Sequence, residues 1–92
     1  MKRIAHYGYR NIVYQRLKAS RKEQKLSQSD LAARLQTYNI NIDQQAISKI
    51  ERNNRVVTDY ELVCLCRALN VDPEWLLMDY DKLIKHIPPA NG

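Results

Sequence analysis

The chain has 92 residues, of which 45% are hydrophobic and 27% are charged. This length supports one small hydrophobic core and argues against a separate ligand-sensing domain, and the composition is that of a globular rather than a disordered chain. A net charge of +5 favours a polyanionic partner, and no stretch is apolar enough for a signal peptide or a membrane span, so we expect a cytoplasmic protein.

Residues 1–10 are predicted to form an N-terminal arm, because Gly8 interrupts any helical pattern. Lys2 and Arg3 in this arm are either part of a frayed chain end or basic contacts to a nucleic-acid groove. The arm is followed by a predicted helical domain over residues 11–78.

The first helix is predicted from Asn11, which would cap it, to Gln24. Side chains at helical spacing define its buried face. These are Val13, Leu17, Ser20 and the aliphatic part of Arg21. The opposite face is basic and is typical of a solvated helix surface; it carries Arg16, Lys18, Lys22 and Lys25.

Ser27 is a suitable N-cap for the second helix, with Leu31, Ala32 and Leu35 as its buried positions. Gln28 lies in the first turn, where free backbone N–H groups and the helix dipole favour a phosphate. We therefore predict a phosphate contact at Gln28.

The connector over residues 36–42 contains neither glycine nor proline. Either the second helix extends to about Asn39, which we favour, or Asn39 and Asn41 supply the backbone freedom that glycine usually gives. Ile40 and Ile42 are expected to point toward the core.

Asp43 is the predicted N-cap of a third helix over residues 43–52, with Ile47 and Ile50 buried and Ala46 allowing close approach. Its outward face would carry Gln44, Gln45, Ser48, Lys49 and Arg52. Glutamine can bond both N6 and N7 of adenine, and lysine can contact guanine or a phosphate. By itself the pattern is more often that of an ordinary polar helix face.

The segment after this helix is rich in hydrogen-bond donors. Asparagines here can adopt left-handed conformations, and Arg52 and Arg55 flank them. Such a loop suits backbone phosphates, although a solvated turn has the same composition.

Thr58 and Glu61 form a capping-box pattern that predicts a helix from Asp59 to about Leu69. Its apolar face would carry Leu62, Leu65, Cys66 and Leu69. Cys64 and Cys66 point to different sides of such a helix, so we expect buried structural thiols rather than a disulfide or a metal site.

Asp72 and Pro73 predict the start of a last helix, which Pro88 would stop. Its apolar stripe continues into a C-terminal extension and tail over residues 79–92. The stripe consists of Leu76, Tyr80, Leu83, Ile84 and Ile87. It either closes over the helical bundle or forms a two-fold homodimer contact.

Three segments in this order resemble the lambda-repressor-like helix-turn-helix family, also called the XRE family, which includes phage Cro and repressor proteins. They are RKEQKLSQSDLAARL (21–35), AISKIERNNR (46–55) and ELVCLCRALNVDPEWLL (61–77). The resemblance implies an all-α, compact five-helix DNA-binding domain whose second motif helix enters the major groove.

The resemblance also implies roles for individual residues. Gln44, Gln45, Ser48 and Lys49 occupy base-contacting positions, and Gln28, Arg52 and Asn54 occupy phosphate-contacting positions, to which the composition of the loop adds Arg55. Arg21 and Glu51 fall where family members carry a partly buried ion pair. The chain departs from the family in its longer, glycine-free connector, in Asn53 where glycine is usual, and in its extended ends.

These observations favour a sequence-specific DNA-binding transcriptional regulator, with a homodimeric repressor on double-stranded DNA as the main hypothesis. The alternative is a protein-interaction module of the same fold, such as the antitoxin of a toxin–antitoxin pair. An enzyme is not expected, because His6 and His86 are isolated and the two glycines form no phosphate-binding loop. No cofactor, metal or membrane partner is expected.

Overall fold

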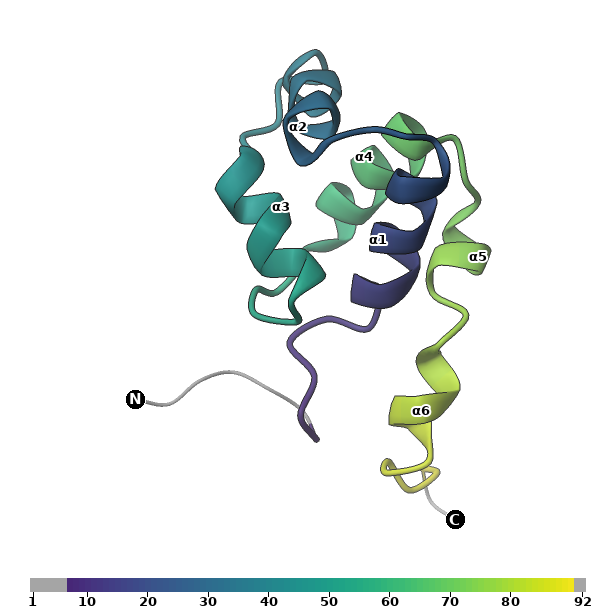
Figure 1. Cartoon of the computed structure of the whole chain (residues 1–92). Helices are drawn as coiled ribbons and strands as arrows, with labels where there is room; N and C mark the ends of the chain where they lie inside the picture. Colours follow the sequence, from purple (N-terminus) through teal and green to yellow (C-terminus); the bar gives the residue numbers. More distant parts are fainter. Residues whose placement is uncertain (1–6, 91–92) are drawn as a thin grey trace.

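The computed structural model describes residues 7–90, and this part of the chain is helical (Figure 1). The helices are α1 (Tyr14–Glu23), α2 (Gln28–Gln36), α3 (Gln44–Glu51), α4 (Asp59–Leu69), α5 (Pro73–Leu76) and α6 (Tyr80–Ile84). The predicted all-α class is therefore confirmed. Lys2 and Arg3 lie outside the described residues. None of these six helices is long and apolar enough to cross a membrane.

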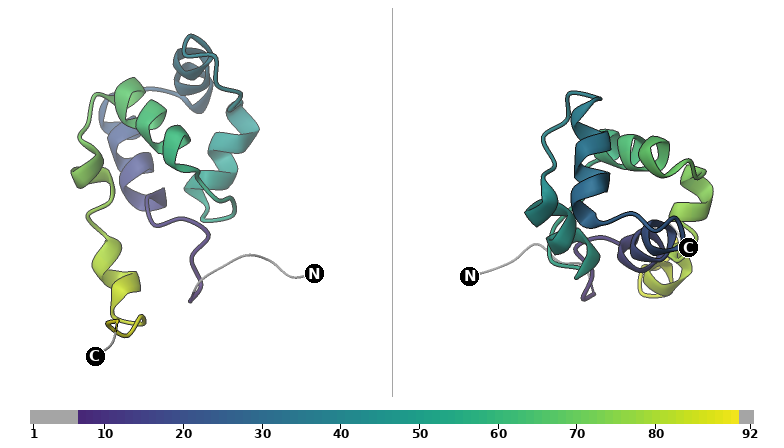
Figure 2. Two further views of the ribbon diagram at one scale, coloured as in Figure 1. Left: turned by 180° about the vertical axis from the view of Figure 1, so that it is seen from behind. Right: turned by 45° about the horizontal axis from the view of Figure 1, so that its top comes forward.

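Helices α1 to α4 surround the hydrophobic core (Figures 1 and 2). Helix α2 contacts both α3 and α4, and α1 contacts α3. The fully buried side chains come from each of these helices, from the α2–α3 connector and from α5: Leu17, Leu31, Leu35, Ile42, Ile47, Ile50, Leu65 and Leu76. Because these side chains interlock, the core fixes the angle between α2 and α3.

Three of the predicted helix caps are present. Ser27 accepts from Asp30 N at 2.9 Å, and the Asp30 carboxylate accepts from Ser27 N at 2.9 Å. Asp43 accepts from Ala46 N at 2.9 Å, and Thr58 forms a capping box with Glu61. These side chains satisfy backbone donors that a helix start leaves free.

The predicted cap of the first helix is wrong. Helix α1 begins at Tyr14, and its N-cap residue Val13 makes no side-chain capping bond. Asn11 instead uses its amide nitrogen to donate to the carbonyls of Ile50 and Arg55, each at 3.0 Å. Asn11 Oδ1 accepts from Val13 N at 3.0 Å, in a local turn that lies before the first residue of α1.

The connector between α2 and α3 combines both predicted alternatives. Regular α-helix ends at Gln36, short of the favoured Asn39. The next three N–H groups bond carbonyls three residues back, which is a tighter, 3₁₀-like winding that reaches Asn39. Asn39 then adopts a left-handed φ of 61°. Ile42 is fully buried, as expected.

The predicted single last helix is wrong, because two short helices, α5 and α6, occupy its place. Arg16 of α1 lies over the Trp75 ring at 4.9 Å and contacts the Asp79 carboxylate at 3.5 Å. Where α5 passes into α6, Met78 N and Tyr80 N donate to carbonyls only three residues back, as in a tight turn. Helices α1 to α5 lie within residues 11–78, in agreement with the predicted five-helix domain, and α6 lies in the C-terminal extension beyond the bundle (Figures 1 and 2).

This break also divides the predicted apolar stripe. Leu76 is fully buried and Leu83 is half-buried, whereas about half of each remaining side chain is exposed, with 56% for Tyr80, 53% for Ile84 and 49% for Ile87. The expectation of one continuous stripe is therefore wrong. Of the predicted stripe, Tyr80, Ile84 and Ile87 are the residues that remain exposed.

Candidate nucleic-acid interface

Helix α3 presents a polar face outward while its apolar face enters the core. Gln44, Gln45 and Lys49 are exposed and Ser48 is half-buried, whereas Ile47 and Ile50 are fully buried. The four residues predicted to contact bases therefore lie on one exposed helix. Gln44 is also tied to α2, because its Oε1 accepts from Ser29 Oγ at 3.2 Å.

Arg21 and Glu51 form a two-point ion pair between α1 and the end of α3. Arg21 Nε lies 2.6 Å from Glu51 Oε2, Arg21 Nη2 lies 3.0 Å from Oε1, and the two side chains are only 9% and 2% exposed. The hydrogen bond to Glu51 raises the pKa of Arg21, against the opposing effect of burial. Arg21 Nη1 also donates to the Leu26 carbonyl at 2.7 Å.

Gln28 connects the start of α2 to the same carboxylate. Its Nε2 donates to Glu51 Oε1 at 3.0 Å. This leaves the Gln28 carbonyl oxygen and one amide hydrogen for a phosphate or water. Hydrogen bonds from Ser27 lower the pKa of the neighbouring Asp30, whose carboxylate occupies the Ser27 N–H. A phosphate at this helix start would therefore use the N–H groups of Gln28 and Ser29.

The loop after α3 brings together the other predicted phosphate contacts. Arg52 and Asn54 are exposed, and Arg52 Nε donates to the Ser48 carbonyl at 3.2 Å. Arg55 is half-buried and binds Glu61 through two contacts, each of 3.1 Å. Burial alone would raise the pKa of Glu61, but Arg55 and the Thr58 N–H together hold that pKa below its usual value.

Asn53 has a role that was not predicted from the sequence. Its Oδ1 accepts from Arg10 N at 2.9 Å and Asn11 N at 3.3 Å, and its Nδ2 donates to the Gly8 carbonyl at 2.8 Å. Asn53 thus fastens residues 8–11 to the end of α3. The available signal was an asparagine at a position where the family usually has glycine.

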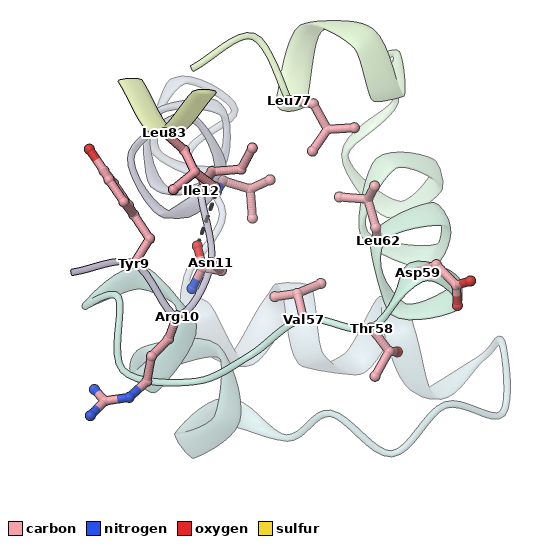
Figure 3. A pocket seen from close by; sticks show the side chains of 11 residues that line it. Tyr9, Arg10, Asn11, Ile12, Val57, Thr58, Asp59, Leu62, Leu77 and Leu83 are labelled. Carbon is pink, nitrogen blue, oxygen red and sulfur yellow. Dashed lines mark hydrogen bonds between the residues drawn. The ribbon is translucent and has the colours of Figure 1, made fainter. Parts of the chain in front are cut away.

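A cavity of about 340 Å³ lies between residues 9–13, the start of α4 and the C-terminal segment. Ile12, Val57, Leu62 and Leu83 contribute apolar side chains to its wall (Figure 3). Figure 3 also shows that the Arg10 side chain points away from this cavity. The Arg10 guanidinium therefore belongs to the outer surface, beside the loop after α3.

A capped α2, an exposed polar α3 whose C-terminal end is held by the buried Arg21–Glu51 pair, and a donor-rich loop define a helix-turn-helix DNA-binding domain. In agreement, the family model HTH_3, described as helix-turn-helix, matches residues 17–76. The chain belongs to this lambda-repressor-like, or XRE, family of DNA-binding regulators. A comparison with curated proteins gave no match.

Proposed function

We propose that this protein is a sequence-specific transcriptional repressor that occupies a two-fold operator as a homodimer. The observation that carries the proposal is the exposed polar face of α3, held in place by the buried Arg21–Glu51 pair. A helix fixed in this way can enter the major groove without being ordered first, so less free energy is lost on binding.

DNA binding would use two groups of contacts, one to phosphates and one to bases. Gln28, Arg52, Asn54 and Arg55 would contact phosphates and set the register of the protein on the duplex. Gln44, Gln45, Ser48 and Lys49 would then distinguish bases through hydrogen bonds in the major groove. A regulator of this kind represses by excluding other proteins from the promoter.

The homodimer would use the exposed apolar surface of Tyr80, Ile84 and Ile87. Leu76 is buried in the core and Leu83 lines the cavity, so neither of these predicted contacts is fully available to a partner chain. Burying the three exposed side chains against their own copies would remove apolar surface from water and give the protein the two-fold symmetry of a palindromic operator.

Selection of bound sites from random double-stranded DNA tests the proposal. We expect a palindromic consensus whose half-site centres are about 34 Å apart, one helical turn of DNA. A consensus without two-fold symmetry would contradict the homodimer, and recovery of random sequence alone would contradict sequence-specific recognition.

The exposed surface of α6 also supports a second candidate, an antitoxin that covers a toxin with these residues. The two functions differ in the state of the purified chain. Sedimentation of a stable homodimer that binds an operator fragment supports the repressor. A monomer that binds no selected DNA supports the interaction module.

A further inference from the structure

The chain segment before α1 lies against the loop that follows α3, and this contact places an additional arginine at the candidate interface (Figure 1). We propose that Arg10 is a further phosphate-contacting residue and that Asn53 is the residue that positions it. The proposal rests on DNA binding as the proposed function and adds a contact that the helix-turn-helix unit alone does not provide.

The backbone at Asn53 does not by itself require asparagine. Asn53 has a left-handed φ of 58°, and the following N–H, of Asn54, bonds the Lys49 carbonyl at 2.8 Å to close the helix end. Glycine would adopt this conformation with less strain. Asparagine adds a side chain that forms three hydrogen bonds to residues 8–11.

Other left-handed asparagines show that such bonding is not automatic. Asn39 and Asn70 have φ values of 61° and 56°, and Asn70 ends α4 in the same way that Asn53 follows α3. Within residues 7–90, neither of them uses its side-chain amide in a hydrogen bond. The amide of Asn53 is therefore distinguished by its contacts to the segment before α1.

Arg10 is available for a phosphate. Its Nη1 donates to Asn54 Oδ1 at 2.6 Å, which leaves four further N–H donors on the guanidinium. Three other arginines, Arg16, Arg21 and Arg55, bind carboxylates. Among the described residues, no carboxylate pairs with Arg10. Its charge lies next to Asn54, a predicted phosphate contact that follows Arg52 by two residues.

A second contact restrains the same segment from its other side. The Tyr7 ring stacks on the His86 ring with centroids 4.9 Å apart and planes at 11°. Residues 7–11 are thus held between the C-terminal segment and the loop after α3. Arg10 is consequently positioned before DNA arrives, which favours a defined phosphate contact over a mobile charge.

The test compares Arg10→Ala, Arg10→Lys and Asn53→Gly with two matched controls. Arg67→Ala removes an exposed arginine from the last turn of α4, far from the loop, and Asn70→Gly makes the same change as Asn53→Gly at another left-handed position. Dissociation constants are measured for the selected operator and for random duplex between 50 and 200 mM salt, well below each melting midpoint.

If Arg10 contacts a phosphate, Arg10→Ala weakens binding to both duplexes and reduces the slope of log K against log salt by about 0.9. The ratio of its dissociation constant to that of the unmodified protein should fall about 3.5-fold from 50 to 200 mM salt. Arg10→Lys should keep the slope, because it keeps the charge. Arg67→Ala should leave the slope unchanged.

If Asn53 positions Arg10, Asn53→Gly weakens binding to both duplexes. The double variant Arg10→Ala/Asn53→Gly should then bind no more weakly than Arg10→Ala alone. Asn70→Gly should bind normally. An unaltered slope for Arg10→Ala, or additive losses in the double variant, would overturn the proposal while the unmodified protein still binds. Failure of the unmodified protein to bind either duplex would instead overturn the proposed function itself.

Discussion

The two ends of α3 differ in how they are bound to the rest of the molecule. At its C-terminal end, Glu51 holds Arg21 and Gln28, and Asn53 in the loop holds residues 8–11. At its N-terminal end, Gln44 makes one exposed contact to Ser29, and the adjacent Gln45 is exposed. One end of the helix is fixed in place, and the other presents polar groups to solvent.

This difference indicates a division between positioning and recognition. Buried polar contacts with every group satisfied fix one arrangement, because any alternative leaves a polar group unpaired. The exposed side-chain amides at the other end can replace their hydrogen bonds to water with hydrogen bonds to a ligand at little cost in free energy. Substitutions at the fixed end should therefore change stability, and substitutions at the free end should change binding.

The largest effect is expected for Glu51→Ala. This change leaves the buried Arg21 guanidinium without its carboxylate, and breaking a buried pair in this way costs about 3–5 kcal/mol of unfolding free energy. Chemical denaturation measures the loss. Glu23→Ala removes an exposed glutamate of α1 and should have little effect. An unchanged midpoint for Glu51→Ala would show that the pair does not stabilise the fold.

The next effect is expected for Asn11→Ala, which removes the donor to the Ile50 and Arg55 carbonyls. Loss of a partner from a buried polar group costs about 1–3 kcal/mol. The control is Asn41→Ala, because Asn41 is exposed in the connector. Equal denaturation midpoints for the two variants would contradict a clamping role for Asn11.

At the free end, Gln44→Ala and Gln45→Ala should alter stability by less than about 0.5 kcal/mol, as is usual for surface positions. On the selected operator, each should cost about 1–3 kcal/mol of binding free energy and relax the preference at one base pair. Arg52→Ala should weaken operator and random duplex alike. Equal losses on both duplexes for the glutamine variants would exclude base contacts.

The smallest effect concerns pH. Because the folded-state pKa of Glu61 is lowered, its ion pair with Arg55 stabilises the protein above the unfolded value of about 4.5, and this stabilisation is lost as pH falls through the folded value. Glu61→Gln should therefore lose less stability than the unmodified protein between pH 7 and pH 3. Thermal midpoints at the two pH values measure the difference, and parallel declines would contradict it.

Local sequence patterns predicted the parts of this fold that local interactions determine. Ser27, Asp43 and Thr58 cap their helices because each acts on N–H groups within the same turn. The pairing of Arg21 with Glu51 followed from the family resemblance, since 30 residues separate them. The exposed face of α3 followed from its helical spacing.

The parts that were missed depend on contacts between distant segments. Asn11 resembles a helix cap in sequence, but its Oδ1 accepts from Val13 N before the helix begins, and its Nδ2 donates to carbonyls 39 and 44 residues away. The last predicted helix is broken where Arg16 of α1 meets Trp75 and Asp79. No local pattern contains this information, because each contact exists only after the helices have packed.

The left-handed asparagines have a further consequence, for the unfolded chain. Asparagine samples fewer backbone conformations than glycine, so less entropy is lost on folding, whereas its left-handed conformation in the native state carries a strain of about 1 kcal/mol or more. At Asn39 and Asn70 only this entropy and this strain distinguish asparagine from glycine. At Asn53 three side-chain hydrogen bonds stabilise the native state in addition. Glycine at these positions would therefore make the denatured ensemble broader everywhere, but would weaken the native contacts only beside α3.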